Sequence, residues 1–380
     1  KNKNNIISKL IPISPEKLLF REPIKADKNL LIQGIKGDTI CVTGAGGSIG
    51  SELSRQISKL SPKKLILIDN SEHNLYKLNQ QLLNEKIDIH LILGDVTSKK
   101  FLKTILSKHQ VKIIFHAAAY KHVPIVENNS LQGIRNNVFS TLAICQLAKE
   151  LRIKKVIYIS SDKAVRPTNI MGSTKRLGEI ITQAYANIEK SLDKESNLKD
   201  KTLFAMVRFG NVVGSSGSVI PLFKEQIKEG GPVTVTDKNI VRYFMSIEEA
   251  SQLVIQAAQL TKGGEVFLID MGNPINIYDL AKQMILRSGF TLKSKDNPKG
   301  EIEIKITGLR PGEKLYEELL IDANSIKTTH PKIYKAYEKT IPSKELFKQL
   351  SFLEKYVNEE DSINALKVLS KLVPDWKKSI

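Results

Sequence analysis

Cysteine, aromatic side chains and long hydrophobic runs are all scarce in this sequence. Its 380 residues include two cysteines, one tryptophan and 6% aromatic residues. Cys41 and Cys145 lie in the apolar stretches DTICVTG and LAICQLA, which favours small core residues over a disulfide or a metal site. No apolar run reaches the roughly 18 residues that a membrane-spanning helix needs, and we find no signal peptide. We therefore expect a cytoplasmic setting and no metal.

Negative charge is also in short supply. Lysine and arginine number 58 against 40 aspartate and glutamate residues, a net charge of +18. This excess indicates an anionic partner: nucleic acid, an acidic membrane surface or a phosphorylated substrate. The lysines are scattered and are not interleaved with aromatic residues, which argues against nucleic acid. A simple composition bias towards lysine and isoleucine is the alternative.

Strand and helix signals alternate along the first half of the chain. Strands are expected at DTICVTG, KKLILIDN, IDIHLILGD, VKIIFHAAA and KKVIYISS, and helices over residues 48–60, 74–84, 99–109, 131–151 and 172–188. Apolar runs that alternate with amphipathic helices are typical of α/β proteins with a doubly wound parallel sheet. The pattern therefore predicts a Rossmann sheet with a smaller C-terminal part.

The turn after the first expected strand has the composition of a phosphate-binding loop. Its candidate residues are Gly44, Gly46, Gly47, Ser48, Ile49 and Gly50. Glycines allow a tight turn and let backbone N–H groups approach a pyrophosphate at the start of the helix. Asp69 ends the second strand, 19 residues after Gly50, where its carboxylate can accept hydrogen bonds from ribose hydroxyls.

The residues around this loop favour NAD over NADP. Asp69 is followed by Asn70, Ser71 and Glu72, and no nearby arginine is available for a 2′-phosphate. We expect Asp95 and Val96 beside the adenine. Ala117 and Ala118 provide small residues where the backbone can lie close to the cofactor. His116 and His122 have either a cofactor-side or a purely structural role.

These signals divide the chain into four expected parts. They are an N-terminal arm over residues 1–35, an NAD-binding Rossmann domain over 36–208, a mainly substrate-binding part over 209–330 that is interleaved with the Rossmann sheet, and a C-terminal helical tail over 331–380.

The stretch SSDKAVRPTNIMGSTKR follows the fifth expected strand and departs from a common oxidoreductase pattern. Many nucleotide-dependent oxidoreductases carry Tyr-x-x-x-Lys here, but Met171 occupies the tyrosine position and Lys175 the lysine position. Residues four apart on a helix share one face. A methionine cannot exchange a proton, so another group must do so if the chain performs redox chemistry.

Five ordered stretches together resemble a known family. They are TGAGGSIGSEL, FHAAAYKHVPIVE, SSDKAVRPTNIMGSTKR, RFGNVVGSSGSVIPLF and GLRPGEKLYEELL. They resemble the nucleoside-diphosphate-sugar 4,6-dehydratases of bacterial polysaccharide and protein-glycan biosynthesis, in the extended short-chain dehydrogenase/reductase group. The resemblance covers roughly residues 15–330. It is strongest to the long, membrane-anchored members that act on UDP-N-acetylglucosamine.

The resemblance implies an internal redox cycle on a UDP-sugar. C4 is oxidised by hydride transfer to tightly bound NAD, water leaves across C5 and C6, and the hydride returns to C6. It assigns Asp162 as the acid for the C6 hydroxyl and Lys163 as the base for the C5 proton. For Lys163 to act as a base, we expect its pKa to be lowered by burial or by the neighbouring Lys175 and Lys121.

The resemblance also implies roles for the residues around that pair. Lys175 holds the nicotinamide ribose hydroxyls. Another group or an ordered water must relay the proton of the C4 hydroxyl, and Ser161 is the nearest candidate to position it. Met171 is shared with the long members, which favours retention of the C5 configuration. A solvated ion pair in a surface turn is the plain alternative for Asp162 and Lys163.

Further residues are expected to hold the UDP-sugar. The candidates are Lys121, Asn211, Val219, Pro221, Leu222, Gln226, Arg242, Arg310 and Glu313. Arg242 and Arg310 are expected at the diphosphate, Asn211 at the substrate phosphates, and Val219 to Phe223 with Gln226 at the uracil and ribose. Ion pairs within the loops are the alternative for the arginines and for Glu313.

Two other functions stay open at this point. A 4-epimerase or reductase on the same fold needs no acid–base pair for C5 and C6, and such enzymes usually keep the tyrosine. A non-catalytic module that binds a dinucleotide or an anionic polymer is the other. The resemblance further implies a homo-oligomer, and a native protein held at the inner membrane by an N-terminal segment outside this chain, with this domain on the cytoplasmic side.

Overall fold

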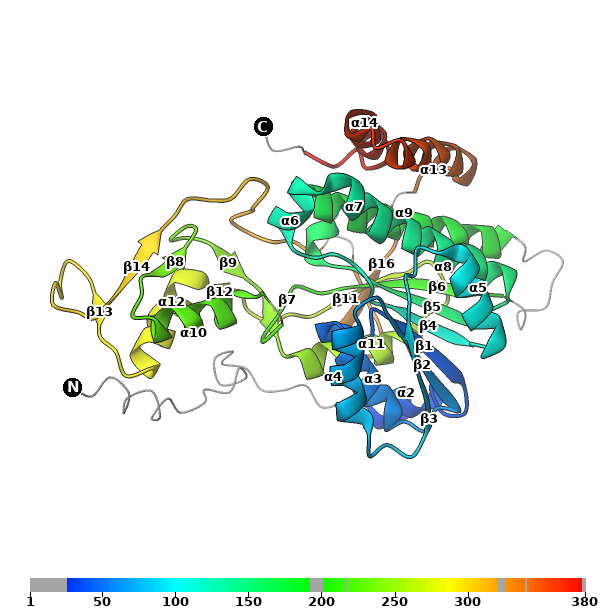
Figure 1. Cartoon of the computed structure of the whole chain (residues 1–380), viewed down its shortest axis with the longest axis horizontal. Coiled ribbons are helices and arrows are strands. Elements are labelled where there is room, and N and C mark those ends of the chain that lie inside the picture. Colours follow the sequence, from blue (N-terminus) through cyan, green and yellow to red (C-terminus); the bar gives the residue numbers. More distant parts are fainter. Residues whose placement is uncertain (1–25, 192–200, 216, 320–324, 339, 378–380) are drawn as a thin grey trace.

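A nine-stranded sheet forms the centre of the molecule, in a computed structural model that describes residues 26–191, 201–215, 217–319, 325–338 and 340–377 (Figure 1). The strand order is β15-β16-β11-β6-β5-β4-β1-β2-β3. The strands are β1 Thr39–Thr43, β2 Lys64–Asp69, β3 Asp88–Leu93, β4 Ile113–His116, β5 Lys155–Ile159, β6 Leu203–Arg208, β11 Val266–Ile269, β15 Ile326–Lys327 and β16 Ile333–Ala336.

Within this sheet, the neighbouring strands β11, β6, β5, β4, β1, β2 and β3 run parallel. Most of them are buried apolar runs, as expected where helices cover both faces, whereas the edge strand β3 is only partly buried. The order reverses at β1, with β2 on one side and β4 on the other, which creates a crevice beyond the carboxyl ends of these strands. The predicted α/β fold with a doubly wound, Rossmann-like sheet is confirmed.

Helices pack on both faces of the sheet (Figure 1). One face carries α3 Ser48–Ser58, α4 Glu72–Leu82, α11 Ile247–Leu260 and α2 Lys28–Gln33, and the other carries α5 Lys99–Lys108, α7 Ser130–Ile134, α8 Ser140–Glu150 and α9 Ile170–Ser191. The single helix expected over 131–151 is interrupted by a π-helical turn at Arg135–Phe139. Within it, the buried Asn137 exchanges hydrogen bonds with the backbone of Tyr120 and donates to Thr174. The irregular turn thus fixes the loop after β4.

The smaller part has its own apolar core. It contains a three-stranded sheet of β13 Leu292–Lys293, β14 Ile302–Ile306 and β8 Val233–Val235, together with α10 Val219–Lys228 and α12 Ile277–Arg287. Two short strand pairs, β7 Asn211–Val212 with β10 Phe244–Met245 and β9 Val241–Arg242 with β12 Ile275–Asn276, lie near its junction with the large sheet. The sequence pattern missed α10 and also α6 Val123–Asn128, two short helices that each contain a proline in the first turn, Pro221 and Pro124.

The ends of the chain differ from the expected arm and tail. Residues 1–25 of the arm lie outside the described residues, and α2 packs its remainder against α11. The expected tail over 331–380 does not begin as a helix, because β16 pairs antiparallel with β11 and extends the main sheet. Helices follow at α13 Ser343–Asn358 and α14 Ser362–Leu372, which pack over α7 and α9.

Candidate active site

The turn between β1 and α3 is so tight that three of its glycines have no room for a side chain. A Cβ on Gly44, where φ is +67°, would lie 2.6 Å from Ala118 Cα. One on Gly46 would lie 2.4 Å from Asn74 Cβ, and one on Gly50 would lie 2.0 Å from the Gly44 carbonyl oxygen. These glycines let the turn pack closely against the loop after β4 and against α4, and the turn lines a cleft at the N-terminus of α3, the kind of place where a pyrophosphate can bind.

Asp69 braces this turn from the end of β2. Its Oδ2 accepts a hydrogen bond from Gly46 N at 2.8 Å, and its Oδ1 accepts one from Ser71 N at 2.9 Å. Asp95 accepts from Thr97 N at 2.8 Å, and the Val96 side chain lies in the core. Their predicted contacts with a ribose and an adenine stay predictions.

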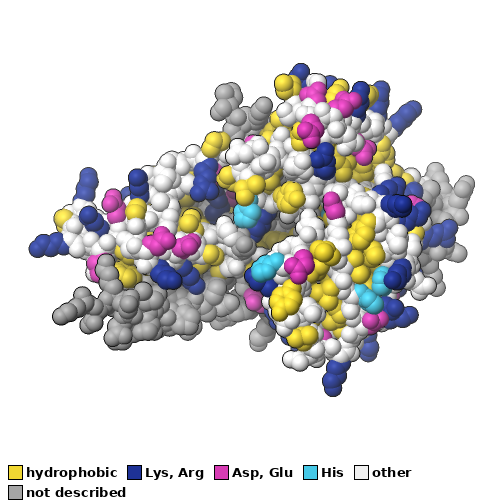
Figure 2. Space-filling view, viewed as in Figure 1, with side chains coloured by type: hydrophobic (Ala, Val, Ile, Leu, Met, Phe, Trp, Pro, Cys, Tyr) yellow, Lys and Arg dark blue, Asp and Glu magenta, His cyan; other side chains and the backbone are white. Residues whose placement is uncertain are grey.

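A cleft of about 880 Å³ separates the large sheet from the smaller part (Figure 2). The predicted residues that line it are Gly44, Gly47, Ser48, Ile49, Gly50, Ala117, Lys121, Ser161, Lys163, Met171, Lys175, Asn211, Val219, Leu222, Arg242, Arg310 and Glu313. The lining does not include Gly46, Asp69, Asp95, Val96, Ala118, Asp162, Pro221 or Gln226. The structure thus brings the expected cofactor turn and most of the expected substrate residues to one cavity.

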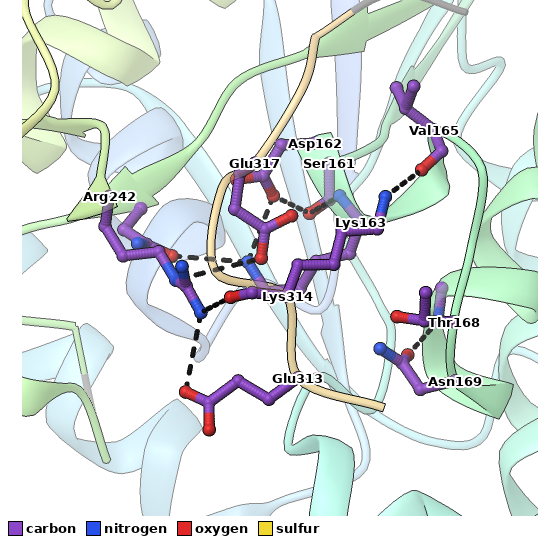
Figure 3. Close-up of polar contacts among 12 residues, drawn as sticks. Ser161, Asp162, Lys163, Val165, Thr168, Asn169, Arg242, Glu313, Lys314 and Glu317 are labelled. Carbon is purple, nitrogen blue, oxygen red and sulfur yellow. Dashed lines mark hydrogen bonds and ion pairs between the residues drawn. The ribbon is translucent and has the colours of Figure 1, made fainter. Parts of the chain in front are cut away.

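Ser161, Asp162 and Lys163 follow β5 at the base of this cleft (Figure 3). Asp162 is completely buried, and its Oδ1 accepts hydrogen bonds from Ser161 Oγ at 2.8 Å and from Lys163 Nζ at 3.1 Å. Lys163 Nζ also donates to Asn211 Oδ1 at 3.3 Å. The pair is part of a hydrogen-bonded cluster at the strand ends, which excludes the alternative of a solvated surface turn.

The electrostatic expectation for Lys163 was wrong. Burial opposes its charge, but the carboxylates of Asp162 and Glu317 outweigh burial and hold the pKa of Lys163 above its usual value. Arg242 acts in the opposite direction and is the weakest of these influences. Lys163 is therefore an ammonium group in this structure, and Lys175 is not among the groups that shift its pKa.

Lys175 and Lys121 show the downward shift that was expected of Lys163. Burial lowers the pKa of Lys175 to about 8, although Glu179 opposes the shift. Lys175 Nζ donates to the Ile159 carbonyl at 2.8 Å and lies 4.8 Å from the centre of the Tyr158 ring. For Lys121, burial and then the charge of Lys163 lower the pKa.

Met171 and Lys175 line the cleft from one face of α9, as their spacing predicted. The two histidines differ. His116 is buried between Thr43 and Thr141, with hydrogen bonds of 2.7 and 3.1 Å, and burial lowers its pKa to about 3. It is therefore a neutral structural group. His122 lines the cleft.

Arg242 holds the loop that follows β14. Its guanidinium donates to the carbonyls of Val241, Lys314 and Leu315 at 2.7–3.1 Å, and its Nη2 lies 3.4 Å from Glu313 Oε1. Most of its donors are thus used within the protein, in line with the loop-packing alternative. Gln226 is similar, because its amide exchanges hydrogen bonds with Thr234 and ties α10 to β8.

Glu317 is a site residue that the sequence did not reveal. It lies in the same loop, is 8% exposed, and places Oε1 at 3.9 Å from Lys163 Nζ and 3.8 Å from Arg242 Nε (Figure 3). The adjacent Glu318 points outward, with a side chain 43% exposed beside Arg166. Two consecutive glutamates give no signal of which one faces inward, and only the path of the loop decides.

Within the described ranges, no cluster of His, Cys, Asp or Glu side chains is arranged to hold a metal ion. Nor does any described helix have the length and apolarity to cross a bilayer.

The sequence of this chain matches a known protein family. Residues 40–338 match the family described as polysaccharide biosynthesis protein. The capsular polysaccharide biosynthesis protein CapD of Staphylococcus aureus is 46% identical over 88% of this chain and 52% of its own length. The chain thus spans about half the length of that relative.

Other relatives are matched over most of their length. The UDP-N-acetylglucosamine 4,6-dehydratase (inverting) of Campylobacter jejuni is 30% identical over 88% of this chain and 90% of its own. The UDP-glucose 4-epimerase of Rickettsia bellii is 32% identical over 74% and 77%. The X-ray structure of Pen from Bacillus thuringiensis is 31% identical, with a TM-score of 0.70 over 83% of this chain and 99% of that one.

Proposed function

The chain belongs to the polysaccharide biosynthesis protein family, and on that premise we propose that it is a UDP-N-acetylglucosamine 4,6-dehydratase. The product is UDP-2-acetamido-2,6-dideoxy-4-hexulose. One observation carries the proposal: an acid–base pair, Asp162 and Lys163, lies at the base of a cleft between a dinucleotide-type turn and a separate smaller part. This is the pair of groups that loss of water from C5 and C6 requires.

The residues at the turn fit NAD. The glycines keep the turn tight, and Gly44, Gly47 and Gly50 line the cleft at the start of α3, where backbone N–H groups can approach a pyrophosphate. Glu72 follows Asp69 closely, and its negative charge disfavours the extra phosphate of NADP. Bound NAD would supply the hydride chemistry, with transfer from C4 and return to C6, so that no net oxidant would be needed. We propose that Lys175, which lines the cleft from α9, holds the nicotinamide ribose hydroxyls.

Ser161 and Asp162 provide a route for the proton of the C4 hydroxyl. Ser161 Oγ lines the cleft and donates to Asp162 Oδ1. We propose that Ser161 orients the C4 hydroxyl and passes its proton to Asp162, in place of the absent tyrosine. Asp162 then gives a proton to the C6 hydroxyl, which leaves as water, while Lys163 removes the C5 proton and later replaces it.

Met171 supports retention at C5. It is 2% exposed, lines the cleft and has no exchangeable proton. With no acid at that position, Lys163 is left as the group that returns the proton to C5, on the face from which it was taken. The inverting dehydratase relative does not decide this point for the present chain.

The substrate side combines cations with an apolar wall. We propose that Lys121 and Arg310 contact the diphosphate and Asn211 a substrate phosphate, while Val219 and Leu222 pack against the uracil. Glu313, whose carboxylate accepts from Thr236 Oγ1 at 3.2 Å and from Arg310 N at 3.1 Å, has room for one further hydroxyl of the substrate. The net charge of +18 favours capture of an anionic sugar nucleotide.

A 4-epimerase is the second candidate, because one relative carries that name. Epimerisation at C4 leaves the C5 and C6 bonds intact and gives Asp162 and Lys163 no proton to move. Proton NMR of the protein with UDP-N-acetylglucosamine in deuterated buffer, without added NAD, separates the two. A new C6 methyl signal with deuterium at C5 is the expected result. A change at C4 alone, or an intact sugar, would contradict the dehydratase proposal.

The cellular location and the oligomeric state of the native protein are also proposals. We propose that it acts as a homo-oligomer at the cytoplasmic face of the inner membrane. Fractionation of cells and sedimentation of the isolated protein test the two parts. Recovery of the native protein entirely free of membranes would contradict the first, and a monomer at micromolar concentration the second.

A further inference from the structure

Two carboxylate oxygens beside Lys163 are buried without a hydrogen-bond partner among the described residues. They are Asp162 Oδ2 and Glu317 Oε2. Asp162 is fully buried, and Glu317 is 8% exposed. A buried acceptor without a donor is unfavourable and uncommon. Two of them around one ammonium group suggest that this cluster binds an additional proton during its work.

The proposed reaction requires such a proton site. Lys163 must be a neutral amine when it removes the C5 proton, but the structure holds it as an ammonium between two carboxylates. Asp162 cannot take the surplus proton, because it has to be protonated already to release the C6 hydroxyl as water. The proton must therefore move to a third group.

The charged groups that act on Glu317 include Lys163, Asp162, Arg242 and Lys314. The guanidinium of Arg242 donates to three backbone carbonyls and has no acceptor atom. Lys314 Nζ donates to the Val165 carbonyl at 2.8 Å. Asp162 is committed to the C6 hydroxyl. Of the two carboxylates that the described ion pairs place beside Lys163, this leaves Glu317 as the proton acceptor.

We propose that Glu317 accepts a proton from Lys163 and so generates the neutral amine that removes the C5 proton, an inference that rests on the proposed dehydratase function. An N–H bond of Lys163 breaks and an O–H bond of Glu317 forms. Lys163 then takes the C5 proton, and its return to C5 restores the amine. Glu317 finally gives its proton back, so the pair ends the cycle as it began.

The surroundings of Glu317 suit this role. Burial and then the charge of Asp162 raise the pKa of Glu317, against the opposing effects of Lys163 and Arg242. The separation of 3.9 Å between Glu317 Oε1 and Lys163 Nζ is short enough for a small side-chain rotation to bring the atoms to hydrogen-bond distance, about 3 Å. Glu317 is a positioning residue in this scheme, because it acts on the substrate only through Lys163.

The test compares Glu317→Gln with Glu318→Gln. The second variant is matched, since Glu318 is the next residue and its carboxylate lies at the surface. The measurement is the pH dependence of deuterium entry at C5 of UDP-N-acetylglucosamine, between about pH 6 and about pH 9. Retained NAD and thermal unfolding of each variant check that the fold is kept.

The expected profiles differ in slope. In the unaltered protein and in Glu318→Gln, proton transfer within the pair involves no solvent, so the exchange rate is flat with pH. In Glu317→Gln, a neutral Lys163 arises only by proton loss to solvent. Its rate should fall by roughly 100-fold at neutral pH and rise about tenfold per pH unit. Glu317→Asp keeps a carboxylate and should keep the flat profile.

The other possible results contradict either the role of Glu317 or the dehydratase function itself. A flat profile in Glu317→Gln, at whatever rate, reduces Glu317 to a structural ion-pair partner, and so does a steep profile in Glu317→Asp. These results leave the dehydratase function intact as long as the unaltered protein forms product. No dehydration by the unaltered protein defeats the proposed function and this inference with it.

Discussion

The surroundings of Lys175 and of Lys163 differ in one respect, the availability of carboxylates. Lys175 is 6% exposed and meets a carbonyl and an aromatic face. Its nearest acid, Glu179, is already bonded to Arg176, Arg208 and Ser160. Lys163 has two carboxylates nearby, Asp162 at 3.1 Å and Glu317 at 3.9 Å, and Arg242 partly balances only the second of them. The pKa of Lys175 therefore falls to about 8 while that of Lys163 rises.

The comparison shows that burial alone does not make a basic lysine. Lys175, on the cofactor side, needs only to donate hydrogen bonds to ribose hydroxyls, and either protonation state allows that. Lys163, on the substrate side, must exchange a proton, and its carboxylates make that exchange depend on where the protons of the cluster reside.

The largest expected effect comes from Lys163→Met. Loss of the only proposed C5 base should lower turnover of UDP-N-acetylglucosamine by roughly 10²–10⁴-fold. Oxidation at C4 does not use Lys163, so absorbance of reduced cofactor should still appear on mixing with substrate. The measurement is stopped-flow absorbance together with product NMR. Full activity in this variant would remove Lys163 from the chemistry and end the contrast with Lys175.

Lys175→Met should separate stability from activity. A lysine whose folded pKa is about 8 against a usual value of 10.5 disfavours the folded state whenever it is charged. The cofactor-free variant should therefore unfold at a higher temperature than the unaltered protein. The gain should be full below about pH 8 and should vanish above about pH 10.5. Retained NAD and activity should fall. Thermal scans across pH measure this, and a lower unfolding temperature at pH 7 would contradict it.

Arg242→Lys should have the smallest effect of the three. The guanidinium donates to three backbone carbonyls on two segments, and an ammonium group cannot reach all of them. The loop that carries Glu313 and Glu317 should loosen, so that KM rises by about tenfold or less and kcat changes little. Arg55→Lys, on the exposed side of α3, is the control. A large loss of kcat with unchanged KM would instead place Arg242 at the reacting atoms.

Local features of this site could be predicted from the sequence, and features that depend on distant segments could not. The turn at Gly44 to Gly50 and the shared face of Met171 and Lys175 follow from spacing within one element. The raised pKa of Lys163 depends on Glu317, which arrives from a loop 154 residues later in the chain. The position of β16 beside β11 is likewise set by a long-range pairing, since its four residues give only a weak strand signal.

Direct titration of the two lysines tests the central claim without any substrate. NMR of the protein with isotope-labelled lysine side chains, assigned with Lys163→Met and Lys175→Met, reports the charge of each ammonium against pH. We expect Lys175 to lose its proton near pH 8 and Lys163 to remain charged beyond the usual lysine pKa of 10.5. Titration of Lys163 at or below the pH at which Lys175 titrates would contradict it.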